Sequence, residues 1–381
     1  MSDKAKIWFF TDIHGSDSCF RKFLNSVNNS NKPNVLIIGA DITGKQIVPI
    51  VEKENKTFVI PLSGRETPIK EKDIDDVKKK LADVGYYPYE CNQIEYNNLS
   101  FDKNYQDEIF EKLAKERLKN WVALAERKLP SFEECKVIIN AGNDDPFFVD
   151  EVLDTSTKMI RAEDKIIDLP AGLKMLSTGY SIKTPWDCPR DISEERLHAK
   201  IASMTSKLNK QDKLLFNFHC PPINSSLDLA IAIDEKTLKK KAGIGKSARI
   251  HVGSESVRKA IEFWQPIASL HGHIHEVHAK EYIGKSLCFN PGSDYQNGLL
   301  QGAFIQINTD GVIELETLTQ EKHSTNGDNS FIDSLISLIP YIGNSFKNYK
   351  TSKKQEDLTK KLDEVDIKVQ EILNKINRDY E

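Results

Sequence analysis

The sequence predicts an α/β fold in which two mixed β-sheets pack face to face. In the first half of the chain, short apolar strands alternate with helical segments, and each strand runs into small or polar residues at its C-terminal end. The second half consists mainly of short β-rich runs separated by turns such as Thr309-Asp310-Gly311. Because ligands bind at the carboxyl ends of strands in open α/β sheets, these strand ends are candidate functional positions.

The strand and helix signals follow one another in a regular order. Strands are expected at residues 7–10, 35–38, 137–139 and 214–218, with further short strands within 159–179. Amphipathic or capped helical patterns cover residues 17–27, 193–208 and 254–264. The β-rich runs of the second half are residues 268–275, 279–282, 286–289, 303–307 and 312–318.

The long stretch at residues 45–135 interrupts the alternation between the second and third strands. It begins with a hairpin pattern at 47–51 and 57–62 and continues with two charged helical segments at 69–84 and 101–129. We interpret it as a helical insertion that covers one edge of the site, within a catalytic domain that spans residues 1–320.

Composition narrows the class of protein. The chain has 381 residues, of which 39% are hydrophobic and 29% charged, and its net charge is −4. These values are typical of a globular protein and argue against strong non-specific attraction to nucleic acid. We expect neither a membrane span nor a signal peptide, because no apolar run is long enough and no cleavage pattern is present. Six cysteines scattered singly favour a reducing, cytoplasmic compartment.

Residues of metal-binding type follow five of the predicted strands. They are Asp12 and His14, Asp41, Asn143 and Asp144, His219, and His273 and His275. Residues two apart in a strand point the same way, so Asp12 and His14 could bind one ion from one face, as could His273 and His275. A carboxylate such as Asp41 can bridge two cations, and Asn143 offers a neutral oxygen.

This mixture of imidazole, carboxylate and amide donors suits Mn, Fe, Zn, Ni or Co better than Ca or Mg. Two such ions about 3.5–4 Å apart activate a water and bind a phosphoryl group in known hydrolases. One Asp-x-His pair is weak support, whereas five donor groups in order, each ending a predicted strand, are strong support. The sequence therefore predicts a dinuclear metal site.

These motifs resemble the calcineurin-like metallophosphoesterase superfamily over about residues 5–320. The resemblance rests on Asp12-x-His14, Gly39-x-Asp41, Gly142-Asn143-Asp144, His219 and Gly272-His273-x-His275. Further stretches are similar to the Icc-like branch of phosphoesterases, namely Gly142-Asn143-Asp144-Asp145-Pro146, Asn217-Phe218-His219-Cys220-Pro221-Pro222, His271-Gly272-His273-Ile274-His275-Glu276 and Asn290-Pro291-Gly292-Ser293-Asp294-Tyr295.

The resemblance implies a four-layer αββα sandwich with a two-metal site, Mn²⁺ being the first expectation, between the sheet edges. It implies that Asp12, His14 and His275 hold the first metal. It implies that Asn143, His219 and His273 hold the second, that Asp41 bridges both, and that a metal-bridging hydroxide attacks phosphorus in line. Asn143 and Asp144 are then the candidate catalytic residues.

Two departures from the superfamily pattern affect this expectation. Ala40 separates Gly39 from Asp41, although the bridging aspartate is retained. Asp144 stands where most of the superfamily has a histidine that protonates the leaving group. Because an aspartate is ionised at neutral pH unless its pKa is raised, three roles stay open: a poor general acid, an orienting residue, or an acid for good leaving groups only.

A second phosphate-site pattern is weaker. Residues 39–45 (GADITGK) resemble a phosphate-binding P-loop, but Gln46 stands where Ser or Thr is needed and no helix pattern follows, so we reject it. The sequence GIGKS at 243–247 also fails, because Lys240 occupies the first glycine position. We interpret the basic run at 236–249 as a solvated loop, with binding of a substrate phosphate as the alternative.

The C-terminal residues form a separate unit in this interpretation. A polar linker at 323–330 precedes a helical appendage at 331–381, in which residues 331–342 are strongly apolar. Apolar residues then recur at spacings of 4-3-4-3-4, the pattern of a coiled-coil seam: Leu358, Leu362, Val365, Val369, Ile372 and Ile376. We expect self-association or a helical protein partner through 331–381, and do not expect a membrane surface as partner.

The leading hypothesis is a metal-dependent phosphodiesterase-type hydrolase with a nucleotide or nucleic-acid substrate. The alternative is a metal-binding regulatory or scaffold subunit that acts through its C-terminal helices, with weak or lost catalysis.

Overall fold

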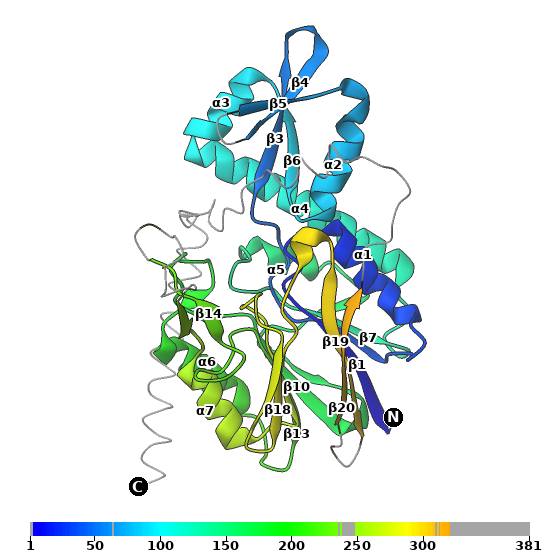
Figure 1. Ribbon diagram of the computed structural model, residues 1–381. Coiled ribbons are helices and arrows are strands. Elements are labelled where there is room, and N and C mark those ends of the chain that lie inside the picture. Colours follow the sequence, from blue (N-terminus) through cyan, green and yellow to red (C-terminus); the bar gives the residue numbers. More distant parts are fainter. Residues whose placement is uncertain are drawn as a thin grey trace.

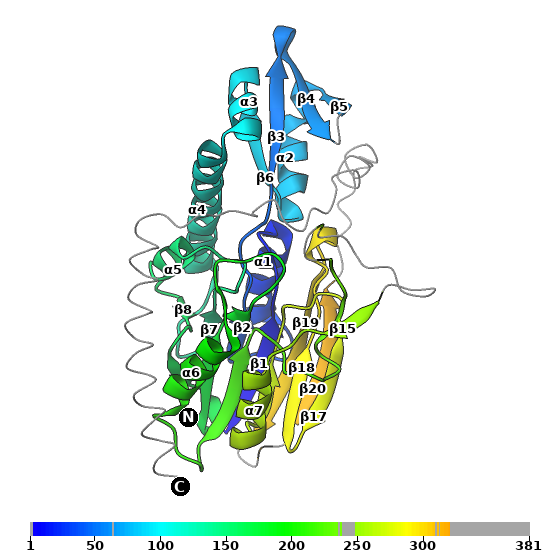
Figure 2. The same cartoon turned by 90° about the vertical axis from the view of Figure 1, so that its left-hand side faces the viewer.

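The computed structural model describes residues 3–62, 65–234, 237, 248–308, 311 and 313–320. Two six-stranded sheets form the core, with helices on both outer faces (Figure 1). The segment between β2 and β7 rises above one end of this core (Figures 1 and 2). The expectation of an α/β sandwich is confirmed. The linker at 323–330 and the appendage at 331–381 lie outside the described residues, as does most of the basic run at 236–249.

The first sheet has the order β20-β19-β1-β2-β7-β8. Its strands are β1 (Lys4–Phe10), β2 (Val35–Ile38), β7 (Lys136–Ile139), β8 (Met159–Arg161), β19 (Leu300–Asn308) and β20 (Ile313–Gln320). The four strands β1, β2, β7 and β8 are parallel, whereas β19 and β20 are antiparallel to their neighbours. The carboxyl ends of β1, β2 and β7 therefore lie at one edge.

The second sheet has the order β17-β18-β16-β13-β10-β9. Its strands are β9 (Ile166–Asp168), β10 (Leu173–Thr178), β13 (Lys213–Phe218), β16 (Ala268–Leu270), β17 (Ala279–Ile283) and β18 (Ser286–Asn290). The four central strands are parallel, and both edge strands are antiparallel. Two short pairs, β11 (Ser181–Ile182) with β12 (Asp191–Ile192) and β14 (Leu229–Ile231) with β15 (Arg249–His251), lie outside this sheet.

Side chains that alternate along the strands build three cores, one between the two sheets and one on the outer face of each sheet. Phe9 and Ile37 of the first sheet contact a cluster that includes Met175, Leu215 and Phe289 of the second. Burial on both faces explains why these strands read as continuous apolar runs. The three cores together make four layers in the order helix, sheet, sheet, helix.

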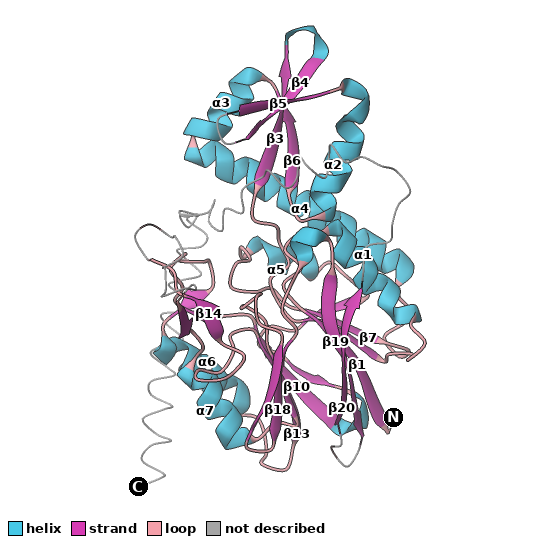
Figure 3. Ribbon diagram, viewed as in Figure 1, coloured by secondary structure: helices cyan, strands magenta, loops and turns pink. Residues whose placement is uncertain are grey.

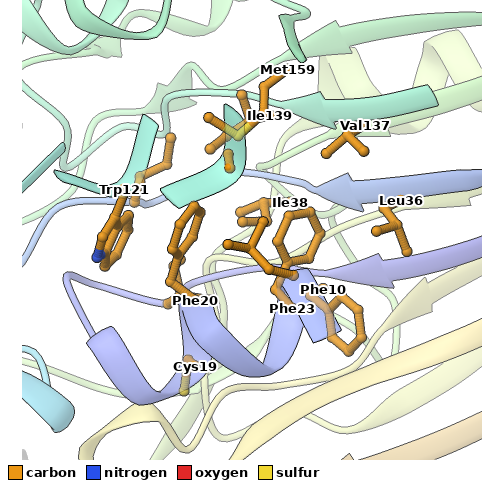
Figure 4. Packing of buried hydrophobic residues seen from close by; sticks show 14 of the residues in the cluster. Phe10, Cys19, Phe20, Phe23, Leu36, Ile38, Trp121, Val137, Ile139 and Met159 are labelled. Carbon is orange, nitrogen blue, oxygen red and sulfur yellow. The ribbon is translucent and has the colours of Figure 1, made fainter. Parts of the chain in front are cut away.

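The outer cores join helices to the sheets. On the first sheet, Phe10 packs with residues of α1 (Asp17–Asn25), α4 (Lys103–Lys128) and α5 (Phe148–Leu153) (Figure 4). Phe20 and Trp121 stack there with ring centroids 4.2 Å apart. On the second sheet, Phe216 packs against α6 (Glu194–Thr205) and α7 (Glu255–Trp264).

The segment at 47–128 contains a sheet of its own as well as helices, which the sequence interpretation missed in part. The order of its strands is β5-β4-β3-β6. Its elements are β3 (Ile47–Lys53), β4 (Thr57–Leu62), β5 (Arg65–Ile69), α2 (Ile74–Asp83), β6 (Tyr87–Cys91), α3 (Gln93–Phe101) and α4. The β3–β4 hairpin is confirmed. The helix predicted at 69–84 was too long at its start: Ile69 is the last residue of β5, residues 71–73 form a 3-10 helix, and α2 begins at Ile74.

The metal-binding motifs do not lie on strands, contrary to the sequence argument. β1 ends at Phe10 and β16 ends at Leu270, so Asp12, His14, His273 and His275 belong to the loops that follow. Such loops gather at the end of the core that faces the inserted segment (Figure 3). Their backbones are free to turn several donors inward, which a strand with alternating faces would not allow.

Within the described residues, no helix combines the length and the apolar character that crossing a membrane would require.

Candidate metal centre

The loops after β1, β2, β7, β13 and β16 bring all the predicted metal ligands together where the two sheets meet. Asp12, His14, Asp41 and His275 each offer a ligand atom, and these atoms lie within 4.8 Å of one another. The Nε2 atoms of His14 and His275 are 3.0 Å apart, and His275 Nε2 is 3.2 Å from Asp12 Oδ1. Facing lone-pair atoms of this kind form the coordination environment that a cation requires.

A second group of donors adjoins the first. Asn143 Oδ1 lies 3.0 Å from His219 Nε2 and 3.1 Å from His273 Nδ1. Asp41 Oδ2 lies between the two groups, 3.2 Å from His219 Nε2 and 3.6 Å from His14 Nε2. One carboxylate oxygen thus faces both donor groups, and the mixed nitrogen and oxygen set fits first-row divalent transition metals.

Backbone strain accompanies this convergence. Asp12, His14, Asp41 and His273 have φ values of 53°, 36°, 50° and 71°, in the left-handed region that side chains other than glycine rarely adopt. Such conformations cost about 1–3 kcal/mol each and persist only where the surroundings impose them. Four of the proposed ligands share this conformation, and all four lie in the loops that carry the donors.

Glycines give the carboxylates room. A Cβ atom at Gly142 would lie 1.9 Å from Asp41 Oδ1, and one at Gly272 would lie 2.2 Å from Asp12 Oδ2. These glycines are therefore required by close approach to the side chains that would bind metal.

Asp191 orients the amide of Asn143, a role that the sequence interpretation did not identify. Asn143 Nδ2 donates to Asp191 Oδ1 over 2.9 Å, which directs Oδ1 of Asn143 to the histidines. Asp191 Oδ2 in turn accepts from the backbone N–H groups of Thr184 and Cys188, each at 3.0 Å. Burial raises the pKa of Asp191 to about 6, opposed by these hydrogen bonds.

Asp145 holds the loop after β2 against the loop after β7. Its carboxylate accepts from the backbone N–H groups of Ile42, Thr43 and Gly142 at 2.7–2.9 Å, and from the Thr43 hydroxyl at 2.6 Å. Thr43 also lies near His14, whose Nδ1 is 3.4 Å from the Thr43 carbonyl oxygen. Nothing in the sequence distinguishes the inward role of Asp145 from the outward role of Asp144.

Asp144 has partners on both carboxylate oxygens. Oδ1 accepts from the Cys188 thiol at 2.8 Å, and Oδ2 pairs with the Lys45 ammonium. Its backbone N–H donates to Asp41 Oδ1 over 3.2 Å. Burial alone would raise the pKa of Asp144, but the charges of Lys45 and His14 hold it well below its usual range. The carboxylate is therefore ionised, which favours the orienting role among the three left open.

The electrostatics of the centre show crowding of buried charge. Burial, supported by Asp144 and Asp12, raises the pKa of Asp41 to about 6. Burial would lower the pKa of His219, but Asp41 and Asp12 raise it to about 9. Burial followed by the charge of His219 lowers the pKa of His273 to about 3. Bound cations would compensate the buried carboxylates directly.

Two other histidines near the motifs have structural contacts. His271 is buried, with Nδ1 2.7 Å from the Phe218 carbonyl oxygen, and burial lowers its pKa to about 4. His251 is partly exposed and lies 2.7 Å from Asp228.

Comparison with known proteins identifies one distant relative by sequence. No protein-family model matches the chain. The uncharacterized protein MJ1162 of Methanocaldococcus jannaschii is 29% identical over 143 residues, which are 37% of this chain and 58% of that protein. The match thus spans little more than half of the relative's length.

Three solved structures are similar over most of this chain. One crystal structure covers 82% of this chain and 99% of its own, with 15% identity and a TM-score of 0.49. The alignment with TT1561 of Thermus thermophilus covers 82% of this chain and 98% of TT1561, with 11% identity and a TM-score of 0.39. The alignment with the NAD nucleotidase NadN of Haemophilus influenzae covers 83% of this chain and 56% of NadN, with 9% identity and a TM-score of 0.27.

Proposed function

We propose that this chain is a metal-dependent phosphoesterase of the calcineurin-like kind, with two divalent cations. The observation that carries the proposal is the position of Asp41. Its Oδ2 atom faces His14 on one side and His219 on the other, at 3.6 Å and 3.2 Å, so one buried carboxylate serves two donor groups. Mn²⁺ is the first cation to test, and Fe, Zn, Ni and Co suit the same donors.

The residues divide into two ligand groups in this proposal. Asp12, His14 and His275 would hold one cation, Asn143, His219 and His273 would hold the other, and Asp41 would contact both. When bound, two such cations supply Lewis-acid activation of water and neutralise the charge on phosphoryl oxygens.

The remaining contacts prepare these ligands. Asp191 fixes the direction of the Asn143 amide, and Asp145 fixes the loop that carries Asp41. Such outer contacts commonly change metal affinity 10- to 100-fold when they are removed. The inserted segment adjoins the site, because Arg117 of α4 donates to the carbonyl oxygens of Gly15 and Tyr86 at 2.6 Å and 2.8 Å. We propose phosphodiesters of the nucleotide or nucleic-acid class as substrates, by analogy with the superfamily that the motifs resemble.

Hydrolysis of bis-p-nitrophenyl phosphate tests this function. Metal-depleted protein is assayed with and without added Mn²⁺, beside p-nitrophenyl phosphate as the monoester. We expect activity that depends on Mn²⁺, is greater on the diester, and is lost in Asp41→Asn. Protein that binds two ions per chain yet hydrolyses neither ester would reject the phosphoesterase and leave the scaffold alternative.

A further inference from the structure

Lys45 pairs with Asp144, the residue that follows the proposed ligand Asn143. Its ammonium group pairs with Asp144 Oδ2, and the two side chains are 23% and 21% exposed. The proposed ligands Asp12, His14, Asp41 and His219 are, by contrast, at most 2% exposed. The Lys45–Asp144 pair is therefore a charged group of this site that solvent, and hence a substrate, can reach, and the side chain of the proposed ligand His275 is also 19% exposed.

The backbone holds both members of the pair in place. Before Lys45, the N–H groups of Ile42 and Thr43 are bound by Asp145, and the N–H of Gly44 donates to the Tyr87 hydroxyl at 2.9 Å. Lys45 is thus carried by a stretch that begins at Asp41 and is fixed at three successive residues.

Asp144 is fixed as firmly as Lys45. Its N–H donates to Asp41, and its Oδ1 accepts from the Cys188 thiol. With Oδ1 occupied by the thiol, the carboxylate presents Oδ2 to the lysine. The ion pair therefore has a defined position relative to Asp41, the residue that faces both donor groups.

Two observations place the Lys45 charge beside open space and beside the donors. A small pocket is lined by Lys45, Gln46, Tyr86 and Tyr295, among others. The ring of Tyr295 lies 4.8 Å from that of His14 between centroids, so the pocket adjoins the first donor group.

We propose that Lys45 is a phosphate-binding residue of this site and that Asp144 is its positioning residue. The ammonium contacts a phosphoryl oxygen of the substrate, and Asp144, engaged through both oxygens, holds the ammonium there instead of donating a proton. The inference rests on the proposed function, and it names a residue of the segment 39–45. That segment is not a P-loop, yet in this proposal its lysine binds phosphate as a point charge.

Binding of inorganic phosphate to the Mn²⁺-loaded full chain tests the inference without requiring turnover. A charge-assisted hydrogen bond contributes about 1.5–3 kcal/mol, so Lys45→Met should weaken phosphate binding about 10- to 150-fold. Lys45→Arg should restore much of the affinity, because it keeps the positive charge. Asp144→Asn should give a smaller loss than Lys45→Met and should raise KM more than it lowers kcat. Lys78→Met removes a lysine from a surface ion pair with Glu90 and serves as the matched control.

Metal content and melting temperature are measured for every variant. If Lys45→Met loses metal because Asp144 is left unpaired, the double variant Lys45→Met/Asp144→Asn removes both charges and decides the case. If metal-loaded Lys45→Met, or the metal-loaded double variant, binds phosphate as tightly as Lys78→Met does, the inference is overturned. Absence of hydrolysis by the unmodified protein, together with phosphate binding that depends on Lys45, would reject the proposed catalysis alone.

Discussion

Asn143 donates a hydrogen bond from Nδ2 to Asp191 Oδ1 over 2.9 Å, and this contact decides which end of the amide faces the metal centre. With Nδ2 so engaged, Oδ1 of Asn143 points to His219 and His273. A flipped amide would present N–H donors there, and an N–H group cannot bind a cation.

Asp191→Asn should therefore weaken metal binding about 10- to 100-fold without unfolding the protein. The single oxygen of the new amide is needed by the N–H groups of Thr184 and Cys188, so its NH₂ group would face the NH₂ group of Asn143 and favour the flip. Titration of the metal-depleted protein with Mn²⁺ measures the loss. Asp187→Asn, at an exposed position of the loop before β12, is the control, and equal affinity of the two variants would contradict the orienting role.

Asp41→Asn tests the shared carboxylate. Removal of its charge should abolish most of the binding of the second ion and nearly all hydrolysis, because a neutral amide cannot neutralise two cations. Elemental analysis of the purified variant gives the metal stoichiometry, with Asp75→Asn on the exposed face of α2 as the control. Two ions per chain in Asp41→Asn would show that Asp41 does not bridge.

The core strands and the donor set could be predicted from the sequence because both depend on local patterns. Strands such as β2 are buried on both faces and therefore read as unbroken apolar runs. The strands β5 and β6 could not be predicted in this way, since each is short, contains a proline and carries charged residues on a partly exposed sheet.

The supporting residues of the site could not be predicted for a different reason. Asp145 binds Ile42 and Thr43 across more than 100 residues of sequence, and Asp191 binds Asn143 across 48. Their roles follow from loops that meet only in the folded chain. Asp12 and His14 do not share a strand face, because β1 ends before them, yet their side chains still converge with the other donors.

Asp145→Asn should destabilise the fold by about 2–4 kcal/mol. The buried carboxylate accepts four hydrogen bonds, and an amide of the same shape leaves at least one donor without a partner. Urea unfolding measures the loss of stability, again with Asp75→Asn as reference. A variant as stable as the reference would mean that this carboxylate does not fix the two loops.

Glu163 should contribute to acid unfolding. Burial would raise its pKa, but Lys200, whose Nζ lies 3.0 Å away, and hydrogen bonds lower it below the usual 4.5. The unfolded chain then binds the proton more tightly, so the contribution of Glu163 is complete above pH 4.5 and is lost as the pH falls through the lower folded value.

Melting temperatures between pH 5.5 and 3 test this sign. Glu163→Gln should melt lower than the unmodified protein at pH 5.5 and should lose less stability on acidification. Glu262→Gln, at an exposed position of α7, should follow the slope of the unmodified protein. Equal slopes in all three proteins would exclude Glu163 as a source of the acid sensitivity.

For the C-terminal appendage, self-association through residues 331–381 stays a prediction from the sequence. An apolar seam such as that from Leu358 to Ile376 is stable only when covered, so removal of residues 321–381 should lower the oligomeric state. Truncation after Gln320 retains β20 and every proposed ligand, and metal binding and hydrolysis should stay nearly intact. If light scattering gives the same number of protomers for the full-length and truncated proteins, self-association through this segment is refuted.

The left-handed backbone at Asp12, His14, Asp41 and His273 lowers the folding stability of this chain, whereas the proposed metal centre needs these four side chains. Glycine adopts such conformations without strain, so thermostability screening that ignores function would favour glycine at these positions and erase the centre. Engineering for heat resistance should therefore hold these residues constant. The sheet of β3 to β6, which carries none of the proposed ligands, is the better place to seek gains.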